Sequence, residues 1–422
     1  MPQEQDTATD RSGPYAGLTV LEVGQFIVVP FCAQFLADGG ARVIKVEPPS
    51  GDAYRSSHPI AEMEGRQFIM KNRGKESVVL KLGDPDANAA LRRLVEAADV
   101  VLVNMRADTV AKHGLTYEDV RAVNPGVIYG SVTAFGRNGP EAGLAGMDVV
   151  VQARSGLLYA LGAEKHDVPY HSEVQVADYS SALLLLSGIS AALYHRERTG
   201  EGQEVDISLL GGAITMQTNA FGNFHDHDDW RREFLDDVLP RAREEKWSSQ
   251  ELNDVRTEMR PDVRLTVCYR VFHTSDGAVA LGAGSPTAQR RLWKLLDIDP
   301  DAEGENLATR LEQEMLAEST QYWLKTLREA LIPVAEVKHI DEIFDDEQAR
   351  AEDLVRTYHH PVAGDYDALG VPIKLSATPF DPGVPAPGFG QHTREALRDV
   401  GYSDDELDAL AAGGSAIFAE EE

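Results

Sequence analysis

The sequence predicts an α/β protein whose first half is Rossmann-like and is followed by a smaller α+β unit. Short β-branched runs alternate with helical stretches from residue 17 onward, and this alternation stops after about Phe221. Strands that alternate with helices at such spacing form a mainly parallel sheet covered on both faces. The 422 residues, 43% of them hydrophobic, are too many for one simple domain, so we expect two.

The elements of the first half are expected in a definite order. β-branched runs predict strands over residues 18–23, 42–46, 99–103 and 127–132, and the intervening stretches predict helices near residues 30–37, 85–97 and 117–123. The turn after the first strand reads VGQFIVVP and lacks the GxGxxG pattern that lets a backbone approach a pyrophosphate. This absence disfavours a Rossmann-like dehydrogenase with a standard NAD site.

One carboxylate, Asp178, stands at the head of a long apolar segment. The sequence up to Tyr194 is an almost continuous run of helix formers, and it closes in a cationic turn followed by Gly200 and Gly202, which predicts a buried helix. Asp178 would then lie at the helix N-terminus, where unpaired N–H groups and the backbone dipole favour its ionised form. Asp178 is therefore either a helix cap or a nucleophile, and position alone favours the cap.

The second half of the chain is expected to contain a charged segment, a small unit and a loop-rich end. Residues 224–264 are typical of a linker or exposed helices. Strands over 263–272 and 278–281, with helices near 287–296 and 306–329, predict the small unit, and a final helix is expected at 404–411. The expected boundaries are a disordered tail at 1–14, a large Rossmann-like domain over 15–223, a linker over 224–262, a small α+β domain over 263–332 and a C-terminal segment over 333–422.

Composition disfavours several classes of partner. A net charge of −29 argues against nucleic acid and anionic membrane surfaces, because both require basic patches. The apolar stretch at 182–193 is shorter than the roughly 18 to 20 residues that a membrane span needs. The N-terminus has neither the basic nor the apolar region of a signal peptide, so we expect a cytoplasmic protein. Two distant cysteines without CxxC spacing argue against disulfides and a cysteine zinc site.

Residues 41–81 are locally basic in this acidic chain. They contain eight basic and five acidic residues, a local balance of +3. Such a balance is typical either of a site for a phosphate-bearing ligand or of a solvated surface, and a charge cluster alone favours the surface.

Other polar motifs give weaker signals. Asp148 precedes an apolar run and is able to orient a group near Asp178, although an Asx turn is the commoner role for a loop aspartate. No GxSxG serine elbow occurs in the chain. The remaining candidates are the histidines His225, His227, His359 and His360. Their spacing does not suit a single ion, so we expect no metal site.

Several sequence blocks occur in one order between about residues 15 and 410. They are GLTVLEVG at 17–24, FLADGGARVIKVE at 35–47, GD at 51–52 with Arg55, NRGK at 72–75, ADVVLVN at 98–104, NPGVIYGS at 124–131, the Asp178 helix closing in RTGEG at 198–202, GVPIK at 370–374 and GQHT at 390–393. Read together, the blocks resemble the class III CoA-transferases, a family that includes formyl-CoA transferase and the carnitine and bile-acid CoA-transferases. The ordered set carries the resemblance, not any single block.

The resemblance implies an enzyme that moves CoA from an acyl-CoA donor to a carboxylic acid acceptor. Asp178 matches the family's aspartate nucleophile, which forms a mixed anhydride with the donor acyl group and then an aspartyl-CoA thioester. Asp148 matches an acidic residue close to that nucleophile. No permanently bound cofactor is expected, because a coenzyme A thioester is itself the substrate and the exchange needs no ATP, metal or redox group.

The resemblance also implies a CoA site. The backbone of Phe26, Ile27 and Val28 is expected to follow the CoA. Leu80, Asn104 and Met105 are expected to line its nucleotide end. Lys112, Lys75 and Arg106 are expected to offer charge to its phosphates. Of the charged three, Lys112 matches a basic residue of the family, whereas Lys75 and Arg106 are added on charge grounds.

Two positions depart from the family pattern. Many relatives carry an arginine that stacks on adenine where this chain has Pro48, so Arg42, Lys45 or Arg55 would have to replace it. No glycine occurs from residue 223 to 276. The glycine-rich loop that covers the intermediate in formyl-CoA transferase therefore has no counterpart here.

The same resemblance implies an architecture. The C-terminal segment is expected to return to the large Rossmann-like domain, so that the smaller α+β domain is inserted between its two parts. Two chains are expected to form an interlocked homodimer.

Two rival functions stay open. A 2-methylacyl-CoA racemase shares the fold, but it needs a histidine directly before the aspartate of the 146–148 block, and this chain has Met147, whose thioether cannot shuttle a proton. A catalytically silent acyl-CoA-binding protein would bind CoA equally well after Asp178→Ala and would show no exchange. We favour the transferase. The acids exchanged are not defined by the sequence, and short acids or dicarboxylates with succinyl-CoA as donor are the expected class.

Overall fold

A seven-stranded sheet forms the centre of the fold. The computed structural model describes residues 12–260, 267–300 and 306–419. The sheet order is β10-β7-β6-β1-β2-β5-β16, and all neighbours are parallel except β16, which pairs antiparallel with β5. The strands are β1 (Thr19–Val23), β2 (Arg42–Glu47), β5 (Lys75–Leu80), β6 (Val100–Val103), β7 (Ile128–Thr133), β10 (Gln203–Ser208) and β16 (Ala416–Ile417). This mainly parallel sheet confirms the predicted α/β class.

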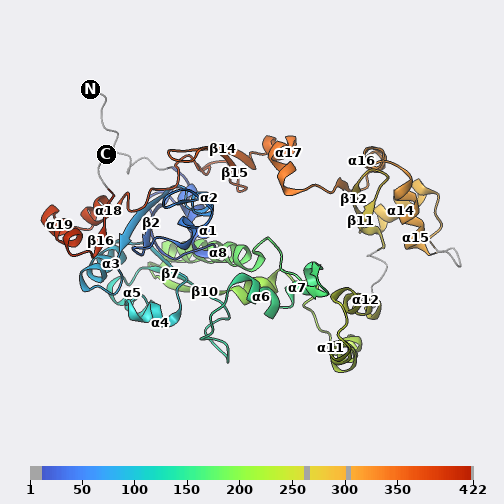
Figure 1. The fold of residues 1–422 in the computed structure, drawn as a ribbon, viewed down its shortest axis with the longest axis horizontal. Coiled ribbons are helices and arrows are strands. Elements are labelled where there is room, and N and C mark those ends of the chain that lie inside the picture. Colours follow the sequence, from blue (N-terminus) through green and yellow to red (C-terminus); the bar gives the residue numbers. More distant parts are fainter. Residues whose placement is uncertain (1–11, 261–266, 301–305, 420–422) are drawn as a thin grey trace. The chain divides into compact units, whose positions relative to one another are not determined.

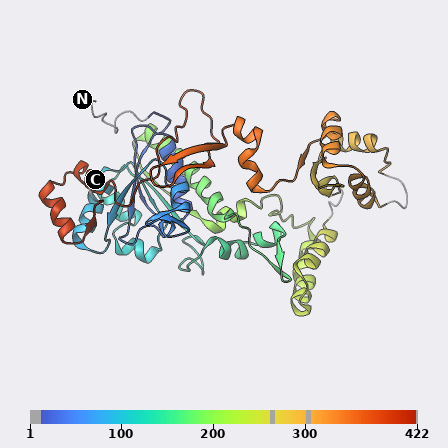
Figure 2. The ribbon, with the colours of Figure 1, turned by 45° about the horizontal axis from the view of Figure 1, so that its top comes forward.

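Hydrophobic layers cover both faces of the sheet. In β1, Val20 belongs to one layer and Leu21 to the other, and Leu102 and Val101 of β6 divide in the same way. Strands buried on both faces need apolar residues at every position, which is why they read as continuous β-branched runs. One layer is formed with α1 (Val28–Asp38), α6 (Asp148–Arg154), α7 (Leu157–Leu161), α8 (Val176–Thr199) and α9 (Leu209–Thr215), and the other with α3 (Pro85–Ala97), α5 (Tyr117–Val123), α18 (Thr393–Asp399) and α19 (Asp404–Ala412) (Figures 1 and 2).

Caps explain why two helices match their predicted limits. The Asp84 side chain accepts from the backbone N–H groups of Asp86 and Ala87, and Pro85 occupies the first helical position of α3. Thr116 caps α5 in the same manner. The strands β5 and β10 were not predicted, because both begin with polar residues that hide the strand signal.

The loop-rich end of the chain contains more regular structure than the sequence predicts. The hairpin of β14 (Val355–His360) and β15 (Gly364–Leu369) was not expected, whereas α19 agrees with the expected final helix. Short elements elsewhere in the first half of the chain, together with α17 near its end, are η1 (Ala53–Arg55), β3 (Pro59–Ala61), β4 (Glu64–Gly65), α2 (Arg66–Lys71), α4 (Ala107–Lys112), β8 (Glu164–Lys165), β9 (Val168–Pro169) and α17 (Glu347–Ala351).

The chain divides into two compact units. The first, called the large unit here, holds residues 1–165, 169–222 and 348–422. The second holds residues 166–168 and 223–347, so it includes the expected linker at 224–262. The expected helix 306–329 is two helices, because Ser319 caps a new one. Part of the expected strand 263–272 lies outside the described residues. The elements of the second unit include α10 (Asp229–Glu233), the π-helix η2 (Phe234–Val238), α11 (Leu239–Glu245), α12 (Ser249–Met259), β11 (Tyr269–His273), β12 (Ala278–Gly282), α14 (Pro286–Leu296), α15 (Leu307–Ala317), α16 (Thr320–Glu329), β13 (Val334–Glu336) and η3 (Ile340–Asp345).

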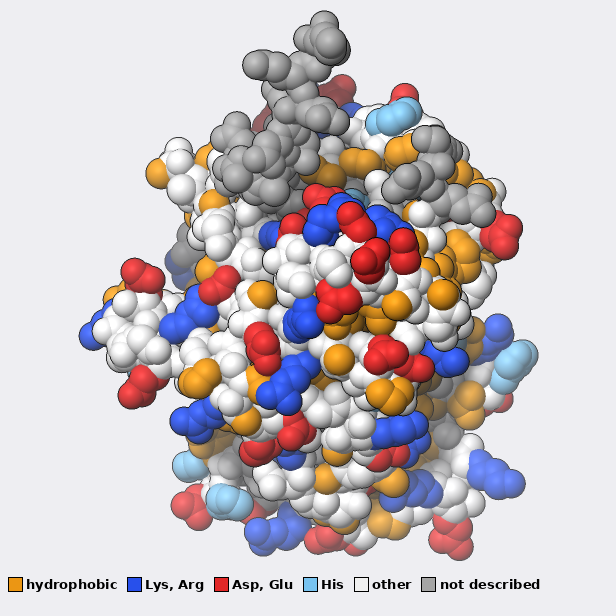
Figure 3. All heavy atoms as spheres, turned by 90° about the vertical axis from the view of Figure 1, so that its left-hand side faces the viewer, with side chains coloured by type: hydrophobic (Ala, Val, Ile, Leu, Met, Phe, Trp, Pro, Cys, Tyr) orange, Lys and Arg blue, Asp and Glu red, His pale blue; other side chains and the backbone are white. Residues whose placement is uncertain are grey.

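Two surface features bear on partners. By length and composition α8 is apolar enough to cross a membrane, but a core helix passes the same test, and Leu185 and Ile189 of α8 are fully buried in the large unit. On the face that carries α18 and α19, acidic and basic side chains are interspersed (Figure 3), and several form ion pairs such as Arg394 with Asp408.

Candidate active site

The strand order defines where a ligand is expected to bind. The chain runs from β1 through β2 to β5 on one side and then crosses to β6 on the other side of β1. In open α/β sheets, ligands bind at the carboxyl ends of the strands where this order reverses. The loops that follow β1 and β6 therefore form the expected binding edge, and they carry most of the residues predicted to contact CoA.

Asn104 joins these two loops. Its side-chain oxygen accepts from Gln25 N–H at 3.0 Å, and its side-chain nitrogen donates to the Gln25 carbonyl at 2.8 Å. A side chain at Gly24 would meet the Asn104 oxygen at 2.9 Å, so glycine is required there. Phe26, which follows Gln25, has a left-handed φ of 68°, a strained backbone conformation typical of functional loops.

The residues beyond Phe26 begin α1 with their side chains inward. Ile27 and Val28 have buried side chains, so neither side chain is available to a ligand. No side chain caps the N-terminus of α1. Its first N–H groups are thus suited to an anion such as a phosphate. Met105 follows Asn104 after β6 and packs partly against the core.

Asp178 and Asp148 come together at the N-termini of two helices. Asp178 lies in the first turn of α8 and Asp148 in the first turn of α6, and both are largely buried. The Asp148 Oδ1 accepts from the N–H groups of Ala177 at 2.8 Å and Asp178 at 3.1 Å. Asp148, and not Asp178, therefore supplies the cap of α8.

This arrangement reverses the expected electrostatics of Asp178. Burial, followed by the charge of Asp148, raises the pKa of Asp178 from its ordinary value to about 7. The expectation that the helix N-terminus keeps Asp178 ionised is wrong, because Asp148 already takes the first-turn N–H groups. Among the described residues, the Asp178 carboxylate accepts no hydrogen bond. An unpaired carboxylate whose pKa lies near neutrality is suited to act as a nucleophile.

Sequence reasoning missed three neighbours of this pair. Gln152, fully buried one turn along α6, donates from Nε2 to Asp148 Oδ2. Tyr179 follows Asp178 and stacks edge-on with Phe31 of α1 at 5.0 Å. The charges of Tyr179 and Asp178 add to burial in raising the pKa of Tyr54 to about 12. Only Gln152 had a sequence signal, its i+4 spacing from Asp148.

The locally basic segment 41–81 is largely internal. Lys75 is buried and pairs with Glu22 at 2.7 Å, and Lys45 pairs with Glu22 at 2.7 Å and Asp52 at 2.9 Å. Arg55 is also fully buried, in a bidentate pair with Glu47. The expectation that Lys75 faces phosphates is therefore corrected, because its ammonium has internal partners.

The same burial corrects the expected replacement for the adenine-stacking arginine. Lys45 and Arg55 have no exposed surface, so neither is available to a base. Arg42 keeps some exposure, but it forms a bidentate pair with Glu76 and a second pair with Asp399.

The remaining predicted CoA contacts differ in exposure. Leu80 has a fully buried side chain in the core and offers it to no ligand. Arg106 precedes α4 and Lys112 ends it, and both are exposed. Arg106 forms a solvent-exposed ion pair with Asp108 at 3.1 Å. The exposed charges suited to phosphates near β6 are thus Arg106 and Lys112.

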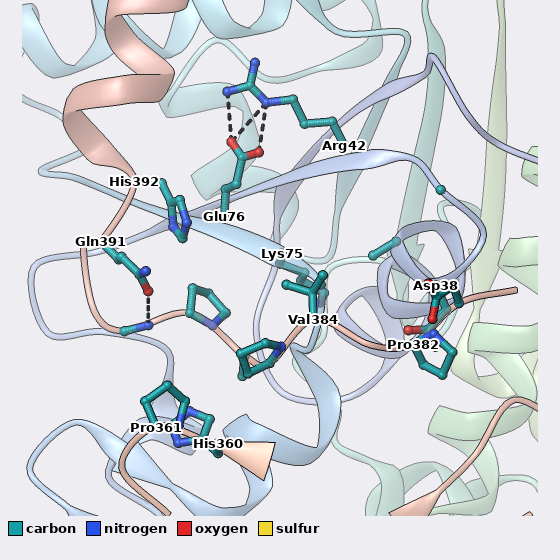
Figure 4. Close-up of a pocket in the computed structure, with 18 of the residues that line it drawn as sticks. Asp38, Arg42, Lys75, Glu76, His360, Pro361, Pro382, Val384, Gln391 and His392 are labelled. Carbon is teal, nitrogen blue, oxygen red and sulfur yellow. Dashed lines mark hydrogen bonds and ion pairs between the residues drawn. The ribbon is translucent and has the colours of Figure 1, made fainter. Parts of the chain in front are cut away.

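A cavity of about 1020 Å³ lies elsewhere in the large unit. Figure 4 shows Arg42 and Lys75, at the starts of β2 and β5, lining it together with Val384 and His392 of the C-terminal segment. It therefore lies at the amino ends of these parallel strands, and Asp178 is not among its lining residues. The described residues hold no cluster of three or more metal-ligating side chains.

Comparison with known proteins identifies the family. A model described as CoA-transferase family III matches residues 15–393 of the chain. The chain therefore belongs to this family, which confirms the resemblance seen in the sequence blocks. It is an enzyme with CoA-transferase activity.

Relatives match over nearly their full length. The chain is 32% identical to the succinate–glutarate CoA-transferase of Agrobacterium fabrum, over 93% of this chain and 96% of that protein. It is 31% identical to the succinyl-CoA:mesaconate CoA-transferase of Haloarcula marismortui, over 92% and 97%. A mutant of Rv3272 from Mycobacterium tuberculosis is similar in structure, with a TM-score of 0.76 and 26% identity over 92% of this chain and 99% of that one. A CaiB/BaiF family protein from Brucella suis is similar in structure, with a TM-score of 0.71 and 27% identity over 92% of this chain and 100% of that one.

Proposed function

We propose that Asp178 carries out CoA transfer as a covalent nucleophile. The observation that supports this most strongly is the burial of its unpaired carboxylate beside Asp148, which raises the pKa of Asp178 to about 7. A carboxylate with this pKa is more basic than an ordinary one, yet a large fraction is still anionic near neutral pH. It is therefore both available and reactive toward a thioester.

The exchange proceeds through Asp178 in four balanced steps. A carboxylate oxygen of Asp178 attacks the donor thioester carbonyl, and the tetrahedral adduct expels CoA as thiolate, which leaves a mixed anhydride of Asp178 and the donor acyl group. The thiolate attacks the Asp178 carbonyl and releases the donor acid, which gives an aspartyl-CoA thioester. The acceptor carboxylate then displaces CoA to form a second anhydride. CoA attacks the acceptor acyl carbonyl, and the new acyl-CoA leaves with Asp178 restored.

Burial favours the covalent states. Acylation of Asp178 removes a charge that desolvation and Asp148 both disfavour, so the neutral anhydride and thioester lose less by being buried than the free carboxylate does. The charge of Asp148 stays stabilised throughout by the hydrogen bonds it accepts from the N–H groups of Ala177 and Asp178. We assign Asp148 to positioning α8 and setting the basicity of Asp178.

The CoA site is proposed along the loops after β1 and β6. In this proposal the backbone from Phe26 to Val28 and the start of α1 follow the pantetheine and phosphates. The absence of a side-chain cap on α1 and the two hydrogen bonds between Asn104 and Gln25, which fix this loop, support it. Arg106 and Lys112 supply the exposed positive charge. Lys75 and Leu80 are left out of this proposal because their side chains are buried.

The acids are proposed to be dicarboxylates, with succinyl-CoA as donor. The two relatives above act, by their names, on succinate and glutarate and on succinyl-CoA and mesaconate. Incubation with succinyl-CoA and a panel of mono- and dicarboxylic acids, read by mass spectrometry of the acyl-CoA products, is expected to give new acyl-CoA mainly from dicarboxylates. No new acyl-CoA from any acid, with CoA still bound, would favour the silent binding protein.

Asp148→Asn is expected to lower the pKa that controls acylation. The asparagine keeps the oxygen that caps α8 but removes the charge that raises the pKa of Asp178. In the parent protein, the rate of CoA release from the donor rises with pH and levels off above about pH 7, because the anion is the nucleophile. Rapid-mixing measurements between about pH 5 and pH 9 should place this midpoint lower in the variant.

Asp148→Ala is the matched comparison. It removes both charge and cap, so it is expected to lower the midpoint and to lose about 1 kcal/mol of stability as well. A midpoint that stays unchanged in both variants would contradict the role assigned to Asp148.

We propose that two chains form an interlocked homodimer that covers the site. Within each chain, the second unit is proposed to be an insertion in the sequence of the large one. Apolar side chains next to Asp148 are exposed in the single chain, with Met147 at 53%, Val149 at 44% and Val150 at 46%. A partner chain on this surface would keep water from the anhydride, a task for which residues 223–276 offer no glycine-rich loop. Light scattering should give twice the chain mass of 46.1 kDa, and a monomer at working concentration would contradict this.

A further inference from the structure

Lys71 is a buried cation without a counter-ion. It ends α2 and is 5% exposed, and its ammonium donates to the Gln67 side-chain oxygen, a neutral group. Among the described residues it pairs with no carboxylate. The other buried cations of the same basic segment are each paired with carboxylates: Lys45, Arg55, Arg73 and Lys75. A buried charge is costly unless it is paired, so Lys71 is suited to an anion that arrives from outside the chain.

Lys71 lies next to the proposed active site. Its Nζ is 5.2 Å from the centre of the Tyr54 ring, and this ring packs edge-on against Phe26 of the CoA loop at 5.5 Å. The Tyr54 hydroxyl has no hydrogen-bond partner within the described part of the chain. The charges of Asp178 and Asp148 act on this hydroxyl and, with burial, keep it protonated, so it stays a donor.

The order of these groups indicates which anion is bound. Asp178 acts electrostatically on Tyr54, whereas the carboxylate that acts on Lys71 is Asp52, which is already paired with Lys45. The Tyr54 ring joins Lys71 to the CoA loop, because the Lys71 ammonium and the Phe26 ring both lie against it. An anionic group held there belongs several bonds away from the reacting carbonyl. A single, nearly buried ammonium also suits a carboxylate better than a phosphate, which takes several charged donors.

We propose that Lys71 and the Tyr54 hydroxyl bind the far carboxylate of a dicarboxylic acid whose near carboxylate exchanges CoA at Asp178. This inference rests on the proposed function and names the residues that select its substrates. Burial lowers the pKa of Lys71 to about 8 in the empty site, and an incoming carboxylate relieves this loss by pairing with the ammonium.

The test compares glutarate with pentanoate, which has the same chain length and lacks the second carboxylate. With succinyl-CoA as donor, the ratio of kcat/KM for the two acceptors should favour glutarate in the parent protein. Lys71→Met should lower this ratio on the order of 10- to 100-fold, mainly through KM for glutarate. Lys71→Arg should retain most of the preference. The matched control is Lys81→Met, which removes an exposed lysine of the same segment and should leave the ratio unchanged.

Tyr54→Phe supplies a second test if Lys71→Met folds poorly. It keeps the ring and removes the donor, and the ratio should fall by about 5- to 10-fold. A parent protein without preference for glutarate, or a ratio unchanged in Lys71→Met and Tyr54→Phe, would overturn the inference. An acyl adduct on Asp178 in the same samples separates the two claims, because its absence in the parent protein refutes the proposed function instead.

Discussion

Replacing Asp178 by asparagine or alanine should reduce CoA exchange on the order of 10⁴-fold or more with any donor and acceptor pair. Either change removes the oxygen that attacks the thioester, and no other carboxylate takes its place, because the Asp148 oxygens are occupied by Ala177, Asp178 and Gln152. Quenched samples of the parent protein treated with hydroxylamine should yield an Asp178 hydroxamate by peptide mass spectrometry. Exchange undiminished in Asp178→Ala would sink the mechanism.

Stability measurements on Asp178→Asn show whether its lost CoA exchange comes from the missing nucleophile or from a less stable fold. A raised pKa means that the folded protein holds this proton more tightly, so the contribution of Asp178 to stability is present below its unfolded pKa and is lost as pH rises through about 7. The asparagine variant lacks this loss. At pH 8 it should be as stable as the parent protein or more stable, by about 4 kcal/mol at most. Urea unfolding at pH 5 and pH 8 measures the difference.

Arg55→Met should destabilise the large unit by about 3 to 5 kcal/mol. The guanidinium is fully buried, binds Glu47 at 2.7 and 2.8 Å, donates to the carbonyls of Met63 and Pro387, and lies 3.6 Å from the centre of the Phe68 ring. Methionine fills much of the space but leaves the Glu47 carboxylate buried without its partner. The urea unfolding midpoint at pH 7 provides the measurement.

Arg92→Met is the matched control for Arg55. Arg92 pairs with Glu96 at 3.2 Å on the exposed surface of α3, where such pairs contribute about 0.5 kcal/mol or less. Equal losses in the two variants would show that the buried pair has no special weight. Because Arg55 also bonds Pro387, its loss is expected to release the C-terminal segment, which limited proteolysis would detect.

The sequence was sufficient for the elements whose local signals agree with the fold. Asp84 and Thr116 are favoured caps, so α3 and α5 could be bounded to the residue. β5 could not be predicted, because Lys75 and Glu76 are typical of a loop. Lys75 is buried because long-range folding brings the Glu22 carboxylate of β1 and the Pro30 carbonyl to its ammonium. The hairpin of β14 and β15 follows from long-range packing that local patterns do not carry.

The two candidate carboxylates were predicted from the sequence, but the electrostatics of the pair was not. Asp178 and Asp148 were recognised from sequence blocks, but the choice of cap and nucleophile depends on which carboxylate reaches the N–H groups of α8. The basic balance of residues 41–81 left open a ligand site or a solvated surface, whereas most of its charge is paired inside the large unit. Lys71 differs from the other buried cations of this segment in pairing with no carboxylate among the described residues, which composition does not reveal.

Transfer of oxygen from substrate to enzyme tests the central claim most directly. When the acceptor carboxylate, labelled with heavy oxygen, attacks the aspartyl thioester, the later collapse of the anhydride leaves one labelled oxygen on Asp178. After a single turnover, the peptide that contains Asp178 should be two daltons heavier, and repeated turnover should raise the shift toward four daltons as its second oxygen exchanges; fragmentation should assign the shift to this residue, and the shift should be absent without donor. Turnover that leaves Asp178 unlabelled, or that labels another residue, would contradict the account.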